Sequence, residues 1–149
     1  MTRIQQRIDE LIIRLKQLDA LSDVRFVREY GNESVEMPVR SVMAVVGIAE
    51  TTRERGYIGG YLSSSLKGEC YGAKVEIRVY SPASENGSGL SELVSELLMG
   101  LEKADRENII TSASARSIEF DPDMNAIFRT VEFRIEFCLC EEEQRGLLL

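Results

Sequence analysis

The chain has 149 residues, of which 18 are basic and 25 acidic, so that its formal net charge is −7. This length is typical of one domain with a sizeable core, and the acidic balance argues against a protein that binds the phosphates of nucleic acid. The sequence contains no histidine, which excludes Ser-His-Asp and Cys-His catalysis and every zinc site with histidine ligands.

The first predicted element is an amphipathic helix over 4–18. Its apolar residues recur at steps of three and four, which places them on one face of a helix. They are Ile4, Ile8, Leu11, Leu15 and Leu18. Because charged residues occur throughout this stretch, we expect neither a signal peptide nor a membrane span.

Two strands and a long loop are predicted next. The segment 24–30 alternates weakly and ends at a Gly-Asn turn signal. The segment 39–50 is the most continuously apolar stretch, which favours a strand covered on both faces. From 51 to 72 the periodicity stops and five glycines occur. A stretch of this length without periodicity predicts a functional or poorly ordered loop.

The second half of the chain contains the clearest patterns. Alternation predicts a strand over 73–80, and an apolar stripe predicts a second helix over 90–101. A further strand runs from 109 to about 120, and a turn at 121–125 leads to the final strand over 127–139. In this final strand the odd-numbered residues share one apolar face, which only Arg129 interrupts.

These elements predict an α+β fold. Two helices pack on one face of a four- or five-stranded, mainly antiparallel sheet, which also carries a long Gly-rich loop. We expect the other face of the sheet to be exposed to water. Residues 1–140 are predicted to form a single domain, and residues 141–149 a flexible tail that begins with acidic residues and ends with an apolar tip.

No set of residues predicts a metal or cofactor site. Cys138 and Cys140 lack the further ligands that zinc needs, and we interpret them as incidental thiols. Since three cysteines are an odd number, we expect no disulfide framework and a reducing cytoplasm. The glycines within 56–60 lack the Lys-Ser/Thr of a phosphate loop, and Asp121 and Asp123 belong to an ordinary turn.

The loop at 51–72 combines basic and aromatic side chains, which are enriched at protein interfaces. We therefore expect it to dock a partner and to be poorly ordered in the free subunit; the plain alternative is a mobile surface loop without a partner. The predicted docking residues are Arg53, Arg55, Tyr57, Ile58, Tyr61, Leu62 and Lys67.

The order of elements resembles the tail terminator (tail-completion) proteins of long-tailed bacteriophages and phage-derived contractile tails. Five segments carry the resemblance. They are the helix at 4–18, the apolar strand at 42–48 with a long loop after it, the Gly-rich approach to a strand at 71–77, the strand, polar loop and helix start at 79–90, and the closing strands that end in 128–137. The resemblance covers nearly the whole chain, and it is one of pattern and element order rather than of a binding motif.

The resemblance implies a structural protein. Since the sequence has no histidine and no clustered set of ligands, we also expect that it is not an enzyme and needs no cofactor. Its subunits assemble into a six-membered ring on the tail tube, stop tube polymerisation and present a surface to a head or neck completion protein. DNA passes through the lumen without specific contacts, with which an acidic chain is compatible. The implied location is the host cytoplasm during assembly and then the virion tail, with no membrane partner.

Two other classes of function stay open. A ferredoxin-like ligand-sensing or regulatory module also places helices on one face of an antiparallel sheet, and a ligand-shifted melting temperature would support it. A small enzyme that uses carboxylates, such as a lyase or hydrolase, is the third class, and a deep polar pocket would support it.

Overall fold

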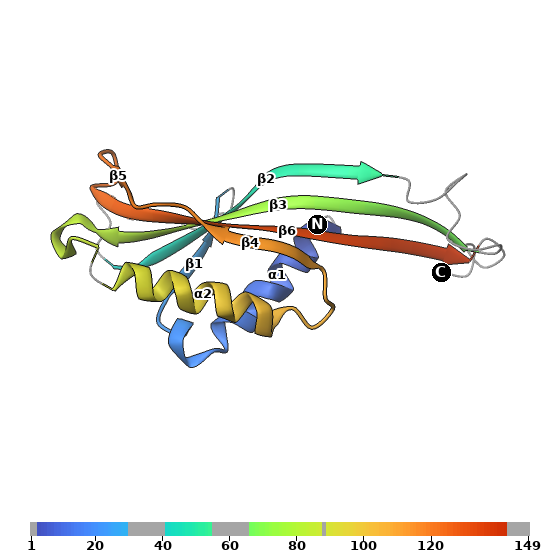
Figure 1. Ribbon diagram of the computed structural model, residues 1–149, viewed down its shortest axis with the longest axis horizontal. Helices are drawn as coiled ribbons and strands as arrows, with labels where there is room; N and C mark the ends of the chain where they lie inside the picture. Colours follow the sequence, from blue (N-terminus) through green and yellow to red (C-terminus); the bar gives the residue numbers. More distant parts are fainter. Residues whose placement is uncertain (1–2, 30–40, 55–65, 88, 143–149) are drawn as a thin grey trace.

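The computed structural model describes residues 3–29, 41–54, 66–87 and 89–142. A six-stranded mixed sheet carries two helices on one of its faces (Figure 1). The predicted α+β class with two helices on a sheet is thereby confirmed, whereas the predicted strand number of four or five is wrong. In the described part of the chain, neither helix is long and apolar enough to cross a membrane.

The elements follow one another in an order close to the predicted one. They are α1 (Arg3–Lys16), the short 3-10 turn η1 (Asp19–Leu21), β1 (Arg25–Arg28), β2 (Met43–Glu54), β3 (Leu66–Pro82), a second short turn η3 (Ala83–Glu85), α2 (Leu90–Ala104), β4 (Ile110–Ala115), β5 (Glu119–Asp121) and β6 (Ala126–Glu142).

The strands are arranged in the order β1-β2-β3-β6-β4, and β5 pairs with β6 beside this path. β1 lies parallel to β2, while every other described pair is antiparallel. The two central strands, β3 and β6, have 17 residues each and pair along their whole length. They form the long axis of the sheet, as Figure 1 shows.

The main core lies between the sheet and the helices. The predicted apolar stripe of α1 is buried from Ile4 to Leu15, and the odd-numbered residues Val131, Phe133 and Ile135 of β6 are buried beneath the helices. α2 approaches the end of α1 closely at Gly100. A Cβ atom at this position would lie 3.0 Å from Leu18 Cδ1, so glycine permits the contact.

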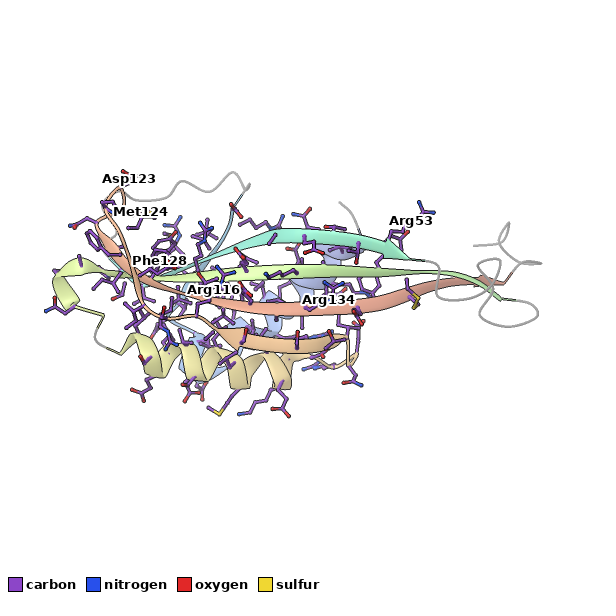
Figure 2. All side chains as sticks on the ribbon, turned by 45° about the horizontal axis from the view of Figure 1, so that its top comes forward. Arg53, Arg116, Asp123, Met124, Phe128 and Arg134 are labelled. Atoms are coloured by element: carbon purple, nitrogen blue, oxygen red, sulfur yellow. A yellow bond between two sulfur atoms is a disulfide. The ribbon has the colours of Figure 1, made fainter. Side chains whose placement is uncertain are left out.

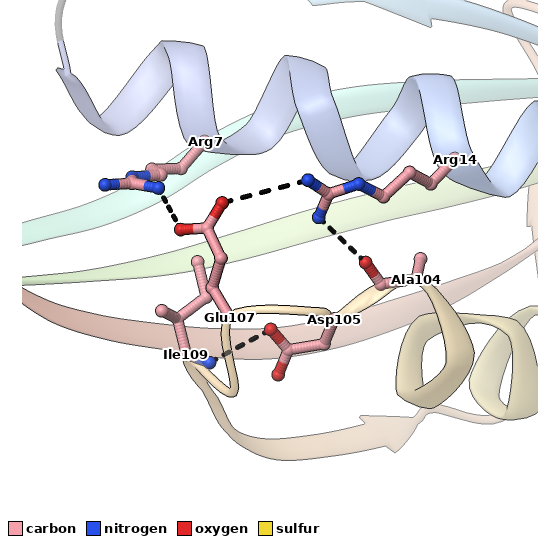
Figure 3. A network of polar contacts seen from close by, with 6 residues as sticks. All are labelled: Arg7, Arg14, Ala104, Asp105, Glu107 and Ile109. Atoms are coloured by element: carbon pink, nitrogen blue, oxygen red, sulfur yellow. Dashed lines mark hydrogen bonds and ion pairs between the residues drawn. The ribbon is translucent and has the colours of Figure 1, made fainter.

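A polar network joins α1 to the turn between α2 and β4 (Figure 3). Glu107 forms ion pairs with Arg7 and Arg14 of α1. Asp105 accepts a hydrogen bond from the backbone N–H of Ile109 at 2.9 Å. The turn is therefore attached to α1 on one side and closed by its own carboxylate on the other.

The opposite face of the sheet is only partly the wet surface that the alternation predicts. A second apolar cluster lies there, and the rings of Tyr80 and Phe128 are 5.2 Å apart within it. The expectation of a uniformly wet face is wrong at this end, because the strands and the turn before β6 contribute one or two apolar residues each, which meet only in the folded sheet. The cluster consists of Val27, Met43, Tyr80 and Ala126, with Val45, Met124 and Phe128 packed against them.

Three predicted boundaries are corrected by strand pairing. The loop predicted at 51–72 is wrong at both ends, because β2 continues to Glu54 and β3 begins at Leu66. The strand predicted over 109–120 divides into β4 and β5, which pair with different parts of β6. β6 runs to Glu142, two residues into the predicted tail. The rest of that tail, 143–149, and the remaining loop, 55–65, lie outside the described residues.

Candidate interaction surface on the strand extension

Three strands run past the layer of helices at one end of the molecule (Figure 1). A 17-residue strand spans about 56 Å at about 3.3 Å per residue. The helices have 14 and 15 residues, so each is only about 21–23 Å long. We call the part beyond the helices the strand extension; it comprises residues 53–54 of β2, 66–70 of β3 and 138–142 of β6, and Tyr71 and Phe137 form its root at the edge of the core.

The strand extension is attached to α1 through aromatic side chains. The ring of Tyr71 on β3 stacks on that of Phe137 on β6, with 5.9 Å between centroids. The guanidinium of Arg7 lies over the Phe137 ring at 5.5 Å. A cation over an aromatic face is attracted by the ring quadrupole, so the first turns of α1 hold the extension where it leaves the core.

On the opposite face, a hydrogen-bonded group crosses three strands. Arg134 donates to Thr52 Oγ1 at 3.2 Å and to a carboxylate oxygen of Glu136 at 3.1 Å. The hydroxyl of Thr52 donates to the backbone carbonyl of Gly72 at 3.4 Å. A Cβ atom on Gly72 would lie 2.8 Å from the Arg134 guanidinium. Glycine therefore leaves the space in which Arg134 reaches from β6 to β2.

A disulfide joins Cys70 on β3 to Cys138 on β6. The prediction of incidental thiols is wrong for Cys138, since the register of β3 and β6 places it directly opposite Cys70. The argument for a reducing cytoplasm from the cysteine count also loses its basis, because disulfides persist mainly in oxidising surroundings. The remaining cysteine, Cys140, lies on β6 opposite Gly68.

Two of the predicted docking residues are described, and they lie on the strand extension rather than on a loop. Arg53 is exposed on β2 and pairs in register with Tyr71, while Lys67 lies on β3 opposite Glu141. Figure 2 shows Arg53 at this end of the molecule and Asp123 at the other. The other five predicted docking residues are outside the described residues; they are Arg55, Tyr57, Ile58, Tyr61 and Leu62.

The polar part of the face opposite the helices carries ion pairs between different strands and the segment after β4. Lys74 contacts Glu132 at 3.4 Å, and Arg116 contacts both Glu76, at 3.4 Å, and Glu132. Figure 2 shows Arg116 near the middle of the sheet. These carboxylates are therefore engaged in contacts between strands.

One of the two carboxylates that the sequence analysis assigned to a turn stabilises that turn in the structure. The carboxylate of Asp121 accepts hydrogen bonds from the backbone N–H groups of Asp123 and Met124, at 2.9 and 3.3 Å, which confirms the predicted turn. Within the residues that the structure describes, no group of three or more cysteine or acidic residues is placed to hold a metal ion. The glycines at 56–60 lie outside those residues.

Neither the known protein-family models nor the sequences of curated proteins give a significant match to this chain. Its function must therefore be argued from its residues and geometry.

Proposed function

We propose that this chain is a structural subunit of the tail-terminator kind. Six copies form a ring on the tail tube of a phage or phage-derived particle, stop tube polymerisation and provide the contact for a head or neck completion protein. The observation that carries this proposal is the strand extension, which holds the two described ends of the predicted docking segment, residues 53–54 and 66–67, at one end of a long sheet.

The attachment of the extension favours a docking role. Its root is held by the disulfide, by the stacking of Tyr71 on Phe137 and by the Arg134 group. Binding is weakened by the conformational entropy that a surface loses on docking, so a surface that is already ordered binds more tightly. In this proposal the strands supply an ordered base, and the predicted residues Arg53 and Lys67 orient the contact with acidic groups of the tube.

We also propose that the chain has no catalytic activity and binds no cofactor or metal. The support is the absence of histidine from the sequence and the engagement of Glu76 and Glu132 in ion pairs. Elemental analysis of the purified protein tests this proposal. Zinc in a stoichiometric amount that disappears in Cys138→Ser would contradict it.

The proposed location is the host cytoplasm during assembly and then the tail of the particle, where DNA passes without specific contacts. Virion surfaces are among the oxidising environments in which disulfides persist. The bond between Cys70 and Cys138 is therefore compatible with the assembled particle.

A tube-polymerisation assay tests the capping role. Tail-tube protein encoded in the same genome is polymerised with this chain, and tube lengths are measured by electron microscopy. Replacing 56–64 by a short Gly-Ser turn retains β2, β3 and the disulfide, and we expect uncapped tubes of uncontrolled length. Phe120→Ser, at the other end of the molecule, serves as the control and should cap normally. Normal tube lengths with the 56–64 replacement would move the docking role elsewhere on the subunit.

The described elements give the ferredoxin-like alternative less support. A ferredoxin-like unit has the order β-α-β-β-α-β, whereas the described elements here begin with a helix and place β1 directly beside β2. A melting temperature that rises with small-molecule ligands would revive the ligand-sensing class.

A further inference from the structure

The outer edge of β4 is open to solvent. β4 pairs with β6 on one side, and no described strand pairs with its other side. The four central residues of β4 are exposed. An unpaired edge offers a row of backbone N–H and C=O groups to another strand, so β4 is available to a further segment of chain.

β4 also lacks the residues that usually protect an edge. Charged side chains and proline discourage pairing with another chain, yet β4 has the sequence ITSASA. The N–H of Arg116 donates to the carbonyl of Thr130 on β6 at 2.8 Å. Because backbone groups alternate in direction along a strand, Ala113 and Ala115 direct their own N–H and C=O groups away from β6. A strand placed at this edge can therefore bond with them.

A groove lies between this edge and α2. It has a volume of about 340 Å³, and its apolar lining consists of Leu98, Leu101, Ile110 and Ala113. The exposed side chain of Glu102 adds a negative charge to the lining. Since a short turn joins α2 to β4, the two elements run in opposite directions, and Glu102 lies nearer the start of β4 than Leu98 does.

The position of α2 favours a single extended segment over a second sheet as the occupant. In both Figure 1 and Figure 2, α2 runs beside β4 at this edge. A second copy that paired its own β4 here would bring its α2 towards the same place. A single strand brings no helix with it, so it can lie along β4 over the groove.

Residues 143–149 supply a segment of this kind. They follow β6, which ends at Glu142 beyond the layer of helices, and they lie outside the described residues. Their sequence is EQRGLLL. Since side chains alternate along an extended chain, Arg145, Leu147 and Leu149 share one face of an added strand. This face presents a cation and two leucines to a groove with an anion and an apolar lining.

The segment of the same copy cannot reach the middle of β4. Ala113 is opposite Phe133, which precedes the end of β6 by nine residues, or about 30 Å along the strand. Leu149 follows Glu142 by seven residues, and seven residues span at most about 25 Å. A segment 143–149 that lies beside Ala113 therefore comes from a second copy.

We infer that residues 143–149 of one copy add as a strand to the outer edge of β4 of the next copy. The segment runs parallel to β4, which places Arg145 near Glu102 and the leucines nearer Leu98. Because the donated segment and the accepting edge are different surfaces, the contact repeats from head to tail, as the contacts of a ring do. This inference names the subunit contact of the proposed ring and rests on that proposal.

Disulfide trapping between two singly substituted chains tests the pairing. In a Cys140→Ser background, a chain with Ala113→Cys is mixed with a longer, tagged chain that carries Leu147→Cys, and the mixture is oxidised. We expect a covalent product of one tagged and one untagged chain on a non-reducing gel. Ile13→Cys in place of Ala113→Cys is the matched control, because Ile13 on α1 is also exposed, and it should give no such product.

Two results of the trapping experiment would overturn the inference. A product of two Ala113→Cys chains without the mixed product would show that the β4 edges pair with each other. The absence of any product would show that the segment does not occupy the edge.

Charge reversal provides a second test that leaves the backbone of β4 unchanged. Glu102→Arg and Arg145→Glu should each weaken self-association in sedimentation by roughly fivefold at low salt, because like charges then meet in the groove. The two changes shift the net charge in opposite directions, so a common weakening cannot arise from net charge. The double variant restores opposite charges and should recover most of the loss.

Glu92→Arg is the matched control for the reversal, since Glu92 is also exposed on α2 and does not line the groove. It should not weaken self-association. A double variant that associates no better than either single variant would contradict the inference, as would equal weakening by Glu92→Arg.

The outcomes separate this inference from the proposed function. Rings that cap tubes but give no mixed cross-link leave the capping role intact and overturn the contact between 143–149 and β4. Mixed cross-links in a chain that fails to cap tubes confirm the contact and overturn the capping role.

Discussion

Phe133 is the residue on which the helix-covered face of the sheet depends most directly. It lies in the middle of β6 with 1% of its surface exposed. Phe133→Asp would bury a charge without a partner, so we expect the variant not to fold, as judged by circular dichroism and urea titration. Phe120→Asp is the matched control, because Phe120 is 57% exposed, and its stability should change by less than about 0.5 kcal/mol. A folded Phe133→Asp would show that another face is the core.

Tyr80 gives the chain a pH-dependent property. Burial raises the pKa of Tyr80 above its ordinary value, and the nearby Arg78 guanidinium opposes this shift. The folded state therefore holds the phenolic proton more tightly than the unfolded state. The resulting stabilisation is fully present below about pH 10, the ordinary tyrosine pKa, and is lost as the pH rises through the higher folded value.

Absorbance titration of the tyrosinate band measures this shift. We expect a tyrosine ionisation above the ordinary tyrosine pKa, and Tyr80→Phe to remove it. The alkaline loss of stability, followed by urea unfolding, should become shallower in the same variant. A native protein and a Tyr80→Phe variant with the same titration midpoint would refute the assignment.

At the scale of elements, the turn from α2 to β4 contains two carboxylates, Asp105 and Glu107, whose contacts should differ in their contribution to stability. Asp105 accepts hydrogen bonds from the backbone N–H groups of Ile109 and Ile110, at 2.9 and 2.8 Å. Asp105→Ala should lower the free energy of unfolding by about 1–3 kcal/mol, because these donors lose their partner. Glu107→Gln breaks an ion pair with Arg7 whose partners are each about one-third exposed, and we expect a loss below about 1 kcal/mol.

Salt distinguishes these two effects. The Glu107→Gln loss should shrink as ionic strength rises, since exposed ion pairs are screened, whereas the Asp105→Ala loss should persist. Urea titrations at low and high salt measure both. Equal losses at every salt concentration would mean that the two carboxylates act in the same way.

The strand extension should depend on its disulfide. The bond between Cys70 and Cys138 connects residues 68 positions apart. Closing a loop of this length lowers the conformational entropy of the unfolded chain, which raises its free energy by about 4 kcal/mol. We expect reduction, or Cys138→Ser, to lower the free energy of unfolding by about 2–4 kcal/mol in urea titrations. Cys140→Ser is the control and should change it little. A reduced protein as stable as the oxidised one would show that the bond does not constrain the chain.

The elements with a complete period of their own were the ones that sequence could predict. The apolar residues of α1 recur once per helical turn, and those of β6 recur at every second position. Both patterns can therefore be recognised from the segment's own sequence. The ends of β2 and β3 were not predictable in this way. Residues 51–54 and 66–72 carry glycines and charges, and only their pairing with neighbouring strands makes them strand.

The candidate site was harder to predict from the sequence, because its residues also meet only through pairing between strands. Gly72 is typical of a loop when read alone, and its role is evident only when Arg134 crosses it from β6. Cys70 and Cys138 meet because of a register that no local pattern specifies. The docking role of all seven predicted residues stays a prediction, and the five from Arg55 to Leu62 lie outside the described residues.

At the scale of the whole molecule, one core joins the two helices to the sheet. Its buried residues come from both helices, from β1, β2 and β3, and from β6. The described helices and strands therefore belong to one packed body, and a contact made on one side of it is held at a fixed position relative to the other side. This geometry is what a head-to-tail ring requires of its subunit.

The net charge of the subunit makes its assembly dependent on salt. Each copy carries −7, so a ring of six carries six times that charge, −42, and its copies repel one another. Because salt screens this repulsion over about 10 Å at 0.1 M, we expect the ring to be less stable at very low ionic strength and to strengthen at moderate salt.

Six copies of 16.8 kDa correspond to about 101 kDa, a mass that sedimentation separates clearly from the monomer. A strict monomer at every salt concentration, both alone and with tube protein, would count against the ring itself.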